Sequence, residues 1–212
     1  MAKTFLFDLA GVLIDWEVMP LYREIFAEDE SAVTRFFDTV LTTQRLNEIS
    51  MGRKAHEVIE ELKHSHPNYG RALDAWIDDW DRMVTGPIEG TVEIARELRR
   101  LGYHTYLLGN WGREEFERAR NRFPLLDEFH GVVISGDHGV MKPSAQIFEI
   151  AVMTFGLTPT ETVFIDDSPR NVQAAALLGF DAIEFTNAKA LRNVLTQRGF
   201  LSDSSSQPAG DS

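Results

Sequence analysis

Residues 4–13 of the chain read TFLFDLAGVL. The run from Thr4 to Leu9 is short, β-prone and apolar on both faces, which predicts a strand buried between two layers of helices. Asp8 lies near the end of this run, and Gly11 follows it closely. Ligands of open parallel sheets bind outside the carboxyl ends of the strands, so Asp8 is the first residue to consider for a functional site.

From residue 86 to residue 201, helical and strand patterns alternate along the chain. This alternation predicts a mostly parallel sheet with helices on both faces. The predicted helices cover about residues 91–101, 113–122, 143–155, 169–178 and 188–197, and the predicted strands cover residues 103–108, 131–135, 162–165 and 182–185. Residues 1–15 and 86–201 together are predicted to form a Rossmann-like α/β core.

Residues 16–85 show a different pattern, in which apolar residues recur at steps of three and four, as in Leu21 and Ile25. This spacing is typical of amphipathic helices, and no strand pattern accompanies it. We therefore predict a small all-helical insertion of three to five helices after the first strand of the core. Residues 202–212 are rich in Ser, Gly, Pro and Asp, which predicts a disordered tail.

The composition excludes several classes of protein. The 212 residues include 33 Asp and Glu against 21 Lys and Arg, so the formal net charge is −12. A field of this sign repels nucleic acid and anionic membranes, and the apolar runs are too short to span a bilayer. The absence of Cys excludes disulfides, thiolate catalysis and Cys-ligated metal sites. The N-terminus has no signal-peptide pattern, and we expect a cytoplasmic protein.

Polar residues follow the predicted strands at the edge where ligands of such sheets bind. They are Asp8, the pair Gly109-Asn110, Lys142 in a loop, and the pair Asp166-Asp167. Carboxylates this close repel one another unless a cation lies among them, and Mg²⁺ typically takes one or two carboxylates plus a substrate phosphate. With the lysine, these residues predict metal-assisted phosphoryl chemistry with a carboxylate as nucleophile.

Four segments of the chain resemble the motifs of the haloacid dehalogenase-like (HAD) hydrolases. They are residues 7–13 (FDLAGVL), 108–110 (LGN), 142–143 (KP) and 164–171 (FIDDSPRN). Their order and spacing hold over nearly the whole chain, and the helical insertion lies where that family has its C1 cap. The sequence looks closest to the branch that contains sugar-phosphate phosphatases such as the glucose-1-phosphate phosphatases.

This resemblance implies a role for each matching residue. Asp8 attacks phosphorus and forms an aspartyl-phosphate, and Lys142 orients Asp8 and the phosphate. The residues implied to hold Mg²⁺ are Asp8, Ala10 through its carbonyl, Asp166 and Asp167, with Asn171 behind them, and those implied to bind phosphate are Gly109, Asn110 and Lys142. The cap closes over the site and selects the leaving group. The implied activity is Mg²⁺-dependent hydrolysis of small phosphorylated metabolites such as sugar phosphates, by a monomer or a homodimer.

Two positions depart from the family's pattern. The residue two after the nucleophile is usually an Asp that acts as general acid and base, but here it is Ala10. Its absence predicts a loss of about 10²–10⁴-fold in rate on alkoxide leaving groups. The second motif usually opens with Ser or Thr, whose hydroxyl binds the phosphoryl group, but here it opens with Gly109. Loss of one donor from an oxyanion hole costs about 2.7–4 kcal/mol, and we expect a comparable weakening here.

Three alternative functions fit parts of this pattern. Phosphonoacetaldehyde hydrolases also carry Asp-x-Ala-Gly at the first motif and form a Schiff base through a cap lysine, for which Lys54 is the local candidate. A haloacid dehalogenase also lacks the second Asp, but needs no metal and therefore no Asp166-Asp167 pair. With both Ala10 and Gly109 present, a weakly active or non-catalytic protein that binds a phosphorylated ligand is the third alternative.

The four tryptophans are interpreted from position and spacing. Trp76 and Trp80 stand at helical spacing and are predicted to be core residues rather than a substrate-stacking surface. Trp16 and Trp111 closely follow the first two motifs, which places them at the entrance of the predicted site.

Overall fold

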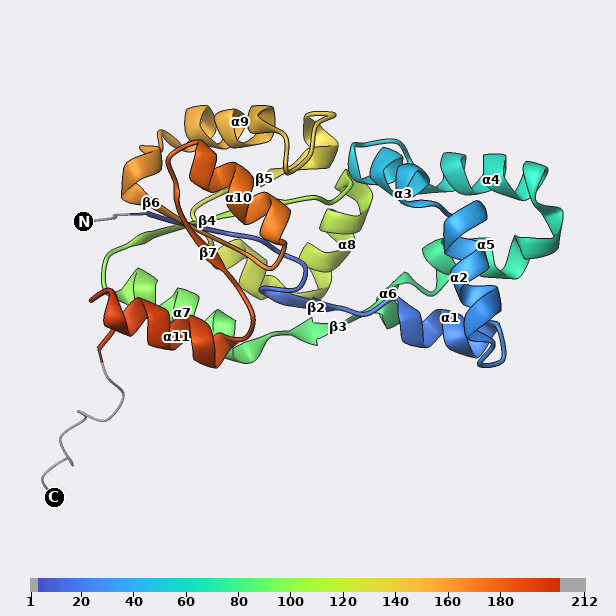
Figure 1. Ribbon diagram of the computed structural model, residues 1–212, viewed down its shortest axis with the longest axis horizontal. Coiled ribbons are helices and arrows are strands. Elements are labelled where there is room, and N and C mark those ends of the chain that lie inside the picture. The colour runs from blue at the N-terminus through green and yellow to red at the C-terminus, as the bar shows by residue number, and fades with distance from the viewer. Residues whose placement is uncertain (1–3, 203–212) are drawn as a thin grey trace, which may run out of the picture.

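The computed structural model describes residues 4–202. It consists of an α/β core and a helical lobe beside it, joined by a two-stranded ribbon (Figure 1). The tail for which disorder is predicted, residues 202–212, lies outside the described residues except for Ser202. Within residues 4–202, no helix combines the length and the apolar character needed to cross a membrane.

The core contains a five-stranded sheet in the order β5-β4-β1-β6-β7, and all neighbouring strands run parallel. The strands are β1 (Thr4–Phe7), β4 (His104–Gly109), β5 (Val132–Ile134), β6 (Thr162–Asp166) and β7 (Asp181–Glu184). The fold class predicted from the alternating pattern is confirmed. Because β1 lies in the middle of the sheet, the residues that follow it lie beside the carboxyl ends of both β4 and β6.

Helices cover both faces of the sheet (Figure 1). One face packs against α7 (Glu89–Arg100), α8 (Arg113–Arg122) and α11 (Ala188–Gln197), and the other packs against α9 (Ala145–Phe155) and α10 (Pro169–Leu177). In β1, Phe5 and Phe7 belong to the hydrophobic cluster on the first face and Leu6 to the cluster on the second, and all three are fully buried. The strand is therefore buried between two helical layers, as its apolar sequence predicts.

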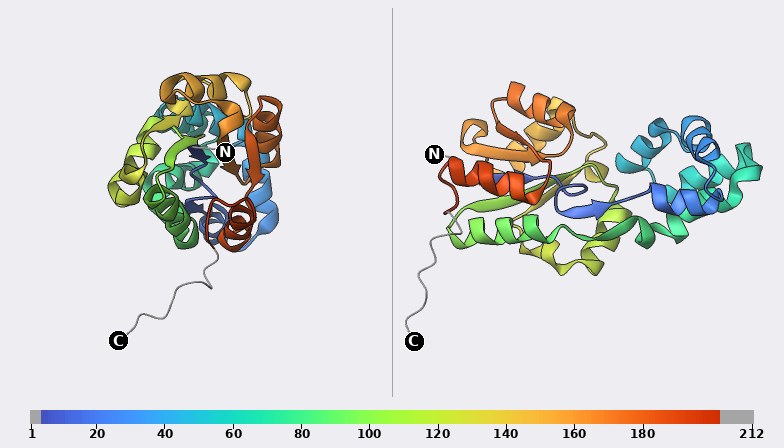
Figure 2. Two further views of the ribbon diagram at one scale, coloured as in Figure 1. Left: turned by 90° about the vertical axis from the view of Figure 1, so that its left-hand side faces the viewer. Right: turned by 60° about the horizontal axis from the view of Figure 1, so that its bottom comes forward.

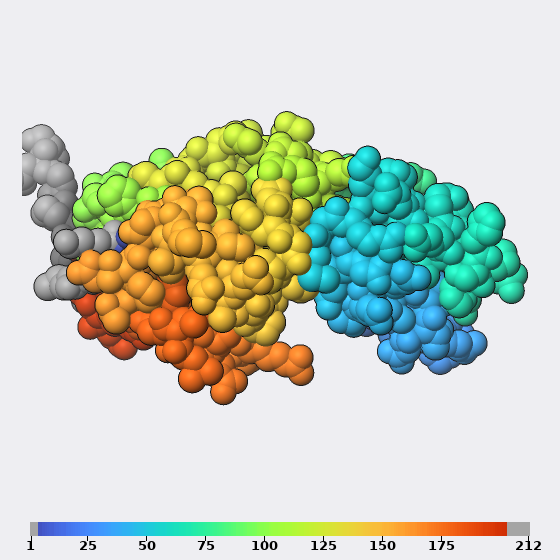
Figure 3. All heavy atoms as spheres, turned by 90° about the horizontal axis from the view of Figure 1, so that it is seen from above, coloured from blue at the N-terminus to red at the C-terminus, as the bar shows by residue number. Residues whose placement is uncertain are grey.

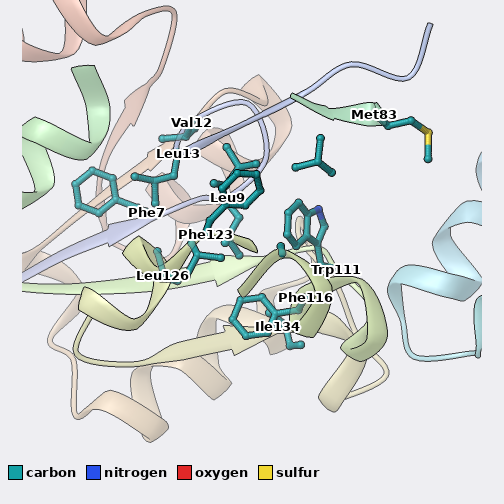
Figure 4. Close-up of a cluster of buried hydrophobic side chains, with 14 of the residues drawn as sticks. Phe7, Leu9, Val12, Leu13, Met83, Trp111, Phe116, Phe123, Leu126 and Ile134 are labelled. Atoms are coloured by element: carbon teal, nitrogen blue, oxygen red, sulfur yellow. The ribbon is translucent and has the colours of Figure 1, made fainter. Parts of the chain in front are cut away.

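Apolar side chains anchor the loop that follows β1 (Figure 4). Leu9, Val12 and Leu13 are fully buried in the same hydrophobic cluster as Trp111 and Phe116. In the first motif, Leu9, Val12 and Leu13 thus pack into the core, while Asp8 remains at the edge of the sheet. This anchoring holds the backbone on both sides of Asp8.

The helical lobe lies within the predicted insertion. Its helices are α1 (Met19–Ile25), α2 (Glu30–Thr39), α3 (Thr43–Ser50), α4 (Ala55–Ser65), α5 (Gly70–Asp78) and α6 (Trp80–Met83). The number exceeds the predicted three to five because α6 has only four residues, too few for a periodic pattern. Seen from above, the lobe contacts the core over a narrow region (Figure 3). There Gly52, with a φ of +104°, lies against the backbone of Gly136.

The ribbon between the two parts consists of β2 (Ile14–Trp16) and β3 (Val84–Pro87), which pair antiparallel (Figure 2). The sequence analysis predicts neither strand. Three or four residues are too few to show an alternating pattern, and the partners lie about 70 positions apart along the chain. A side-chain hydrogen bond from Thr85 to Asp15 adds to the pairing, at 2.7 Å. The chain therefore enters the lobe through β2 and leaves it through β3, which are paired with each other.

Candidate active site at the edge of the sheet

Asp8, which follows β1, and Asp166, the last residue of β6, lie on either side of one buried ammonium group. The Nζ atom of Lys142 is 2.7 Å from Oδ1 of Asp8 and 2.6 Å from Oδ2 of Asp166. Lys142 and Asp166 are almost completely buried, and Asp8 is 8% exposed. The parallel register brings the two carboxylates together, because Phe7 pairs with Ile165 one residue earlier in each strand.

The backbone of Lys142 is held by the side chain of Asn110, which follows β4. The Lys142 N–H donates to Oδ1 of Asn110 at 2.8 Å, and Nδ2 of Asn110 donates to the Lys142 carbonyl at 3.0 Å. Asn110 was predicted to bind phosphate, and the structure places both ends of its amide on the lysine backbone. In this arrangement Asn110 positions the ammonium that lies between the two carboxylates.

The neighbouring carboxylates of Asp166 and Asp167 have different surroundings. Oδ1 of Asp166 accepts hydrogen bonds from the Ser168 N–H and from Nδ2 of Asn171, both at 2.9 Å, and Oδ2 accepts from Lys142. Asp167 is exposed, and no other described residue donates a hydrogen bond to its carboxylate. Both oxygens of Asp166 are therefore engaged by the protein, whereas Asp167 keeps its oxygens available to a ligand.

Three carboxylates gather around the single ammonium group of Lys142. One carboxylate oxygen from each of Asp8, Asp166 and Asp167 lies within 4.8 Å of the others. Burial, together with the charge of Asp166, raises the pKa of Asp8 to about 7 against the pull of Lys142. Partial burial of its carboxyl group and the charge of Asp166 also raise the pKa of Asp167. Burial alone lowers the pKa of Lys142, but the two adjacent carboxylates raise it above its usual value. With all groups charged, the cluster carries an excess of two negative charges, which a divalent cation would neutralise.

The turn after Asp8 brings the backbone close to Asp167. Gly11 has a φ of +79°, and a Cβ atom there would collide with the Asp167 carboxylate. Glycine is therefore required by both the left-handed backbone and the close approach. Ala10, whose carbonyl was predicted to bind the metal, lies in this turn and forms an isolated bridge with Ile14.

The packing around Gly109 leaves no room for the hydroxyl-bearing side chain that usually opens the second motif. A Cβ atom at Gly109 would overlap Cδ1 of Leu9, the residue directly after Asp8. Leu9 is fully buried, and its side chain occupies the space that a Ser or Thr side chain at this position would need. The two motifs are therefore in steric contact. Sequence analysis missed Leu9 because a single apolar residue directly after a buried strand carries no signal of this kind.

A cavity of about 230 Å³ opens beside Ala10 and Asn110, between the core and the helical lobe. Trp16 and Trp111, predicted at the entrance of the site, are among the residues that line it, and so is Trp76, which was predicted to be a core residue alone. The sequence analysis did not predict that Trp76 lines a cavity, because helical spacing shows that a side chain is buried but not what it is buried against.

Comparison with known proteins gives a family and several relatives. The model of the haloacid dehalogenase-like hydrolase family matches residues 2–179. A sesquiterpene phosphatase from Aspergillus oryzae is 24% identical over 192 residues, which cover 89% of this chain and 92% of the relative. A D-ribitol-5-phosphate phosphatase from Bacteroides thetaiotaomicron is also 24% identical, over 213 residues that cover 92% of this chain and 98% of the relative.

Solved structures share the fold. A HAD-like family hydrolase from Porphyromonas gingivalis superimposes with a TM-score of 0.71 at 25% identity, covering 92% of this chain and 98% of that one. A HAD family enzyme from Bacteroides thetaiotaomicron, crystallised with magnesium and inorganic phosphate, gives a TM-score of 0.67 at 22% identity. That alignment covers 88% of this chain and 96% of the other.

Proposed function

The chain belongs to the haloacid dehalogenase-like hydrolases, as its four motifs predict, and from this premise we propose that it is a Mg²⁺-dependent phosphatase of small phosphate monoesters. The observation that carries the proposal is the placement of Asp8. One of its oxygens accepts hydrogen bonds from Lys142 and from the Leu9 N–H, each at 2.7 Å, and no described residue donates to the other. A buried carboxylate with one fixed and one unpaired oxygen is suited to attack phosphorus.

The donor set fits Mg²⁺, which prefers oxygen ligands and keeps several waters. Asp8, the carbonyl of Ala10 and the unpartnered carboxylate of Asp167 would hold the ion. Asp166, whose oxygens accept hydrogen bonds from Lys142, Asn171 and the Ser168 N–H, would support the site from behind. When bound, Mg²⁺ supplies positive charge at the phosphoryl oxygens and neutralises the excess charge of the carboxylates.

In the proposed reaction, a carboxylate oxygen of Asp8 forms a bond to phosphorus while the bond from phosphorus to the leaving-group oxygen breaks. The leaving group departs with that electron pair and takes up a proton. Water then attacks the phosphorus of the aspartyl-phosphate, which releases inorganic phosphate and restores the carboxylate. Lys142, held by Asn110, keeps Asp8 oriented and balances the negative charge that gathers at phosphorus.

Ala10 and Gly109 limit this chemistry in different ways. No carboxyl group stands two residues after Asp8 to protonate the leaving group, so esters of more acidic alcohols should react faster. At Gly109 the missing hydroxyl leaves one fewer donor for the phosphoryl oxygens. Both changes leave the nucleophile and the ligand carboxylates intact.

Phosphate release from p-nitrophenyl phosphate and a panel of phosphorylated metabolites tests the proposal, with Mg²⁺ and with chelator. We expect Mg²⁺-dependent turnover that Asp8→Asn abolishes. A folded preparation that binds Mg²⁺ but releases phosphate from no ester would overturn the proposal and favour a non-catalytic binding protein. Borohydride trapping would detect the Schiff base of a phosphonate hydrolase. Nothing in the structure favours that activity, since Lys54 is exposed and the cavity beside Ala10 has no lysine in its lining.

A further inference from the structure

The four tryptophans of the chain gather in one cluster where the helical lobe meets the core. The ring centroid of Trp16, in the ribbon, is 6.0 Å from that of Trp76, 5.9 Å from that of Trp80 and 6.0 Å from that of Trp111. The rings of Trp80 and Trp111 are 6.1 Å apart. The residues come from the ribbon, the lobe and the loop after β4, so the cluster exists only in the folded chain.

This cluster forms one wall of the cavity beside the candidate nucleophile. Three of the tryptophans, Trp16, Trp76 and Trp111, line it, together with Leu46 and Ile49 from α3. The end nearest the site is lined by Ala10 and Asn110, which flank Asp8 and Lys142 in the site described above. A phosphate ester attacked by Asp8 would therefore extend its leaving group between aromatic and aliphatic side chains.

The cavity offers little to a charged or polyhydroxylated leaving group. Its lining contains no Lys, Arg or His, and its polar side chains are those of Ser50, Asn110 and Glu115. The amide of Asn110 is bound to the Lys142 backbone, and burial raises the pKa of Glu115. The nearby lobe cations Arg45 and Arg53 form ion pairs with Glu48 and Glu61 instead. The indole N–H of Trp76 has no partner among the described residues, but its nitrogen is itself buried. The several hydroxyls of a sugar would therefore give up more hydrogen bonds to water than this lining replaces.

We propose that the leaving group of the substrate is a compact apolar alcohol or phenol rather than a sugar. This inference rests on the proposed phosphatase function and narrows its substrate class. The cavity volume of about 230 Å³ lies below the about 300–1,000 Å³ typical of pockets for drug-sized ligands, so the group is small. The methyl group of Ala10 contributes an apolar surface where the usual Asp would place a charge.

A second, independent feature favours a phenol within this class. With Ala10 in place of a general acid, the leaving group must depart with little help from the protein. A phenolic oxygen has a pKa of about 10, as in tyrosine, so it departs without prior protonation far more readily than an alkoxide. Aromatic rings also pack edge-to-face with tryptophan at the centroid distances found in this cluster.

Three phosphate esters separate these contributions: phenyl phosphate, cyclohexyl phosphate and glucose 6-phosphate. Cyclohexyl phosphate and glucose 6-phosphate both release alkoxide-type leaving groups, one apolar and one with several hydroxyls, so their comparison reports mainly on polarity. We expect kcat/KM to be at least about tenfold higher for the cyclohexyl ester, and higher again for the phenyl ester. Equal or faster Mg²⁺-dependent hydrolysis of the sugar phosphate overturns the inference and leaves the phosphatase proposal standing.

Binding of non-hydrolysable phosphonates tests the inference even if no ester turns over. Benzylphosphonate and a sugar phosphonate would be titrated with Mg²⁺ present, with tryptophan fluorescence as the signal. We expect benzylphosphonate to bind at least about tenfold more tightly. Absence of turnover together with this preference overturns the phosphatase proposal alone, whereas equal binding overturns the apolar cavity as a specificity site.

A pair of variants ties the preference to the cavity. Leu46→Asn places an amide in the lining, and Leu177→Asn makes the same change at a side chain that is 83% exposed on α10. We expect Leu46→Asn to lower the kcat/KM ratio of cyclohexyl phosphate to glucose 6-phosphate at least about fivefold and Leu177→Asn to leave it unchanged. An unchanged ratio in Leu46→Asn, with the melting temperature preserved, contradicts the proposal.

Discussion

The edge of the sheet and the junction with the helical lobe are both buried, but they are built from different interactions. At the sheet edge, the charged groups of Lys142 and Asp166 are bound by several partners at 2.6–2.9 Å. At the junction, aromatic rings pack at about 6 Å, and the indole N–H groups of Trp76 and Trp80 are buried without a hydrogen-bond partner among the described residues.

These two kinds of interaction suit different purposes. The hydrogen bonds at the sheet edge hold the charged groups in one geometry, because a hydrogen bond weakens steeply as its angle departs from linear. Apolar packing defines a shape and excludes water without fixing one orientation. We infer that the core sets the chemistry and that the junction sets which esters reach it. Changes at the sheet edge should therefore affect all substrates alike, and changes at the junction should discriminate among them.

The largest effect is expected from Asp8→Asn. Removing a nucleophile eliminates the covalent route, and we expect kcat to fall at least about 10⁴-fold for every ester tested. Single-turnover phosphate release measures the loss. Asp38→Asn, the same change at an exposed position on α2, is the control and should behave as the wild type. Retention of more than a few per cent of activity in Asp8→Asn would contradict the assigned role.

Lys142→Met should lower both activity and stability. It leaves the buried carboxylates of Asp8 and Asp166 without their counter-ion, and breaking a buried ion pair typically costs about 3–5 kcal/mol. Urea denaturation measures the change, with Lys189→Met on the surface of α11 as control. Mg²⁺ should recover part of the loss, because it binds the folded state. An unfolding free energy close to that of the wild type would show that the ammonium does not hold this edge together.

The pH dependence of stability should carry the signature of Asp8 in metal-free buffer. Folding raises the pKa of this carboxyl from about 3.8 to about 7, so the folded protein binds a proton that the unfolded chain has released. The contribution of Asp8 to stability is therefore present below pH 4 and is lost as the pH rises to 7. Unfolding measured for the wild type and for Asp8→Asn isolates this loss as the difference between the two. A difference that stays constant from pH 4 to 7 would exclude the raised pKa.

Gly109→Ser tests the steric link between the first two motifs. The new side chain collides with Leu9, and overpacking of a core typically costs about 1–3 kcal/mol. In Leu9→Ala/Gly109→Ser the collision is relieved, so the double variant should be more stable than the sum of the single changes by about 0.5–3 kcal/mol. Four unfolding curves form the cycle. Additive effects would show that Leu9 does not decide the glycine at this position.

The smallest effect on catalysis, but the most selective, is expected from Gly52→Ala. Its Cβ atom would lie 2.5 Å from the Gly136 carbonyl oxygen, on a backbone with a φ of +104°. The lobe must shift from the core, and the cavity between them changes shape. We expect kcat/KM to fall severalfold for apolar esters, with little change for glucose 6-phosphate. Gly70→Ala, where nothing lies within 4 Å of the new atom, is the control. A uniform loss across all esters would argue that the lobe also shapes the chemistry.

Much of the fold follows from local pattern. The helices α8 and α11 begin and end at the residues that periodicity predicts, and the five strands of the sheet lie within two residues of their predicted bounds. Parallel strands bring their carboxyl ends to one edge, so the proximity of Asp8 to Asp166 also follows from their places in the sequence. These features depend on interactions between near neighbours or on a general rule of topology.

Other features depend on contacts between distant segments. The pairing of β2 with β3, the attachment of Asn110 to the Lys142 backbone, and the different surroundings of Asp166 and Asp167 have no local pattern. Nor does the overlap of Leu9 with the side-chain position of Gly109, or the gathering of four tryptophans from separate elements. The sequence by itself determined the family, the sheet and the charged residues that meet at its edge, because periodicity and motif order are written along the chain. Only the tertiary structure decided which carboxylate is free and which side chains line the cavity, because these properties are set by packing across the chain.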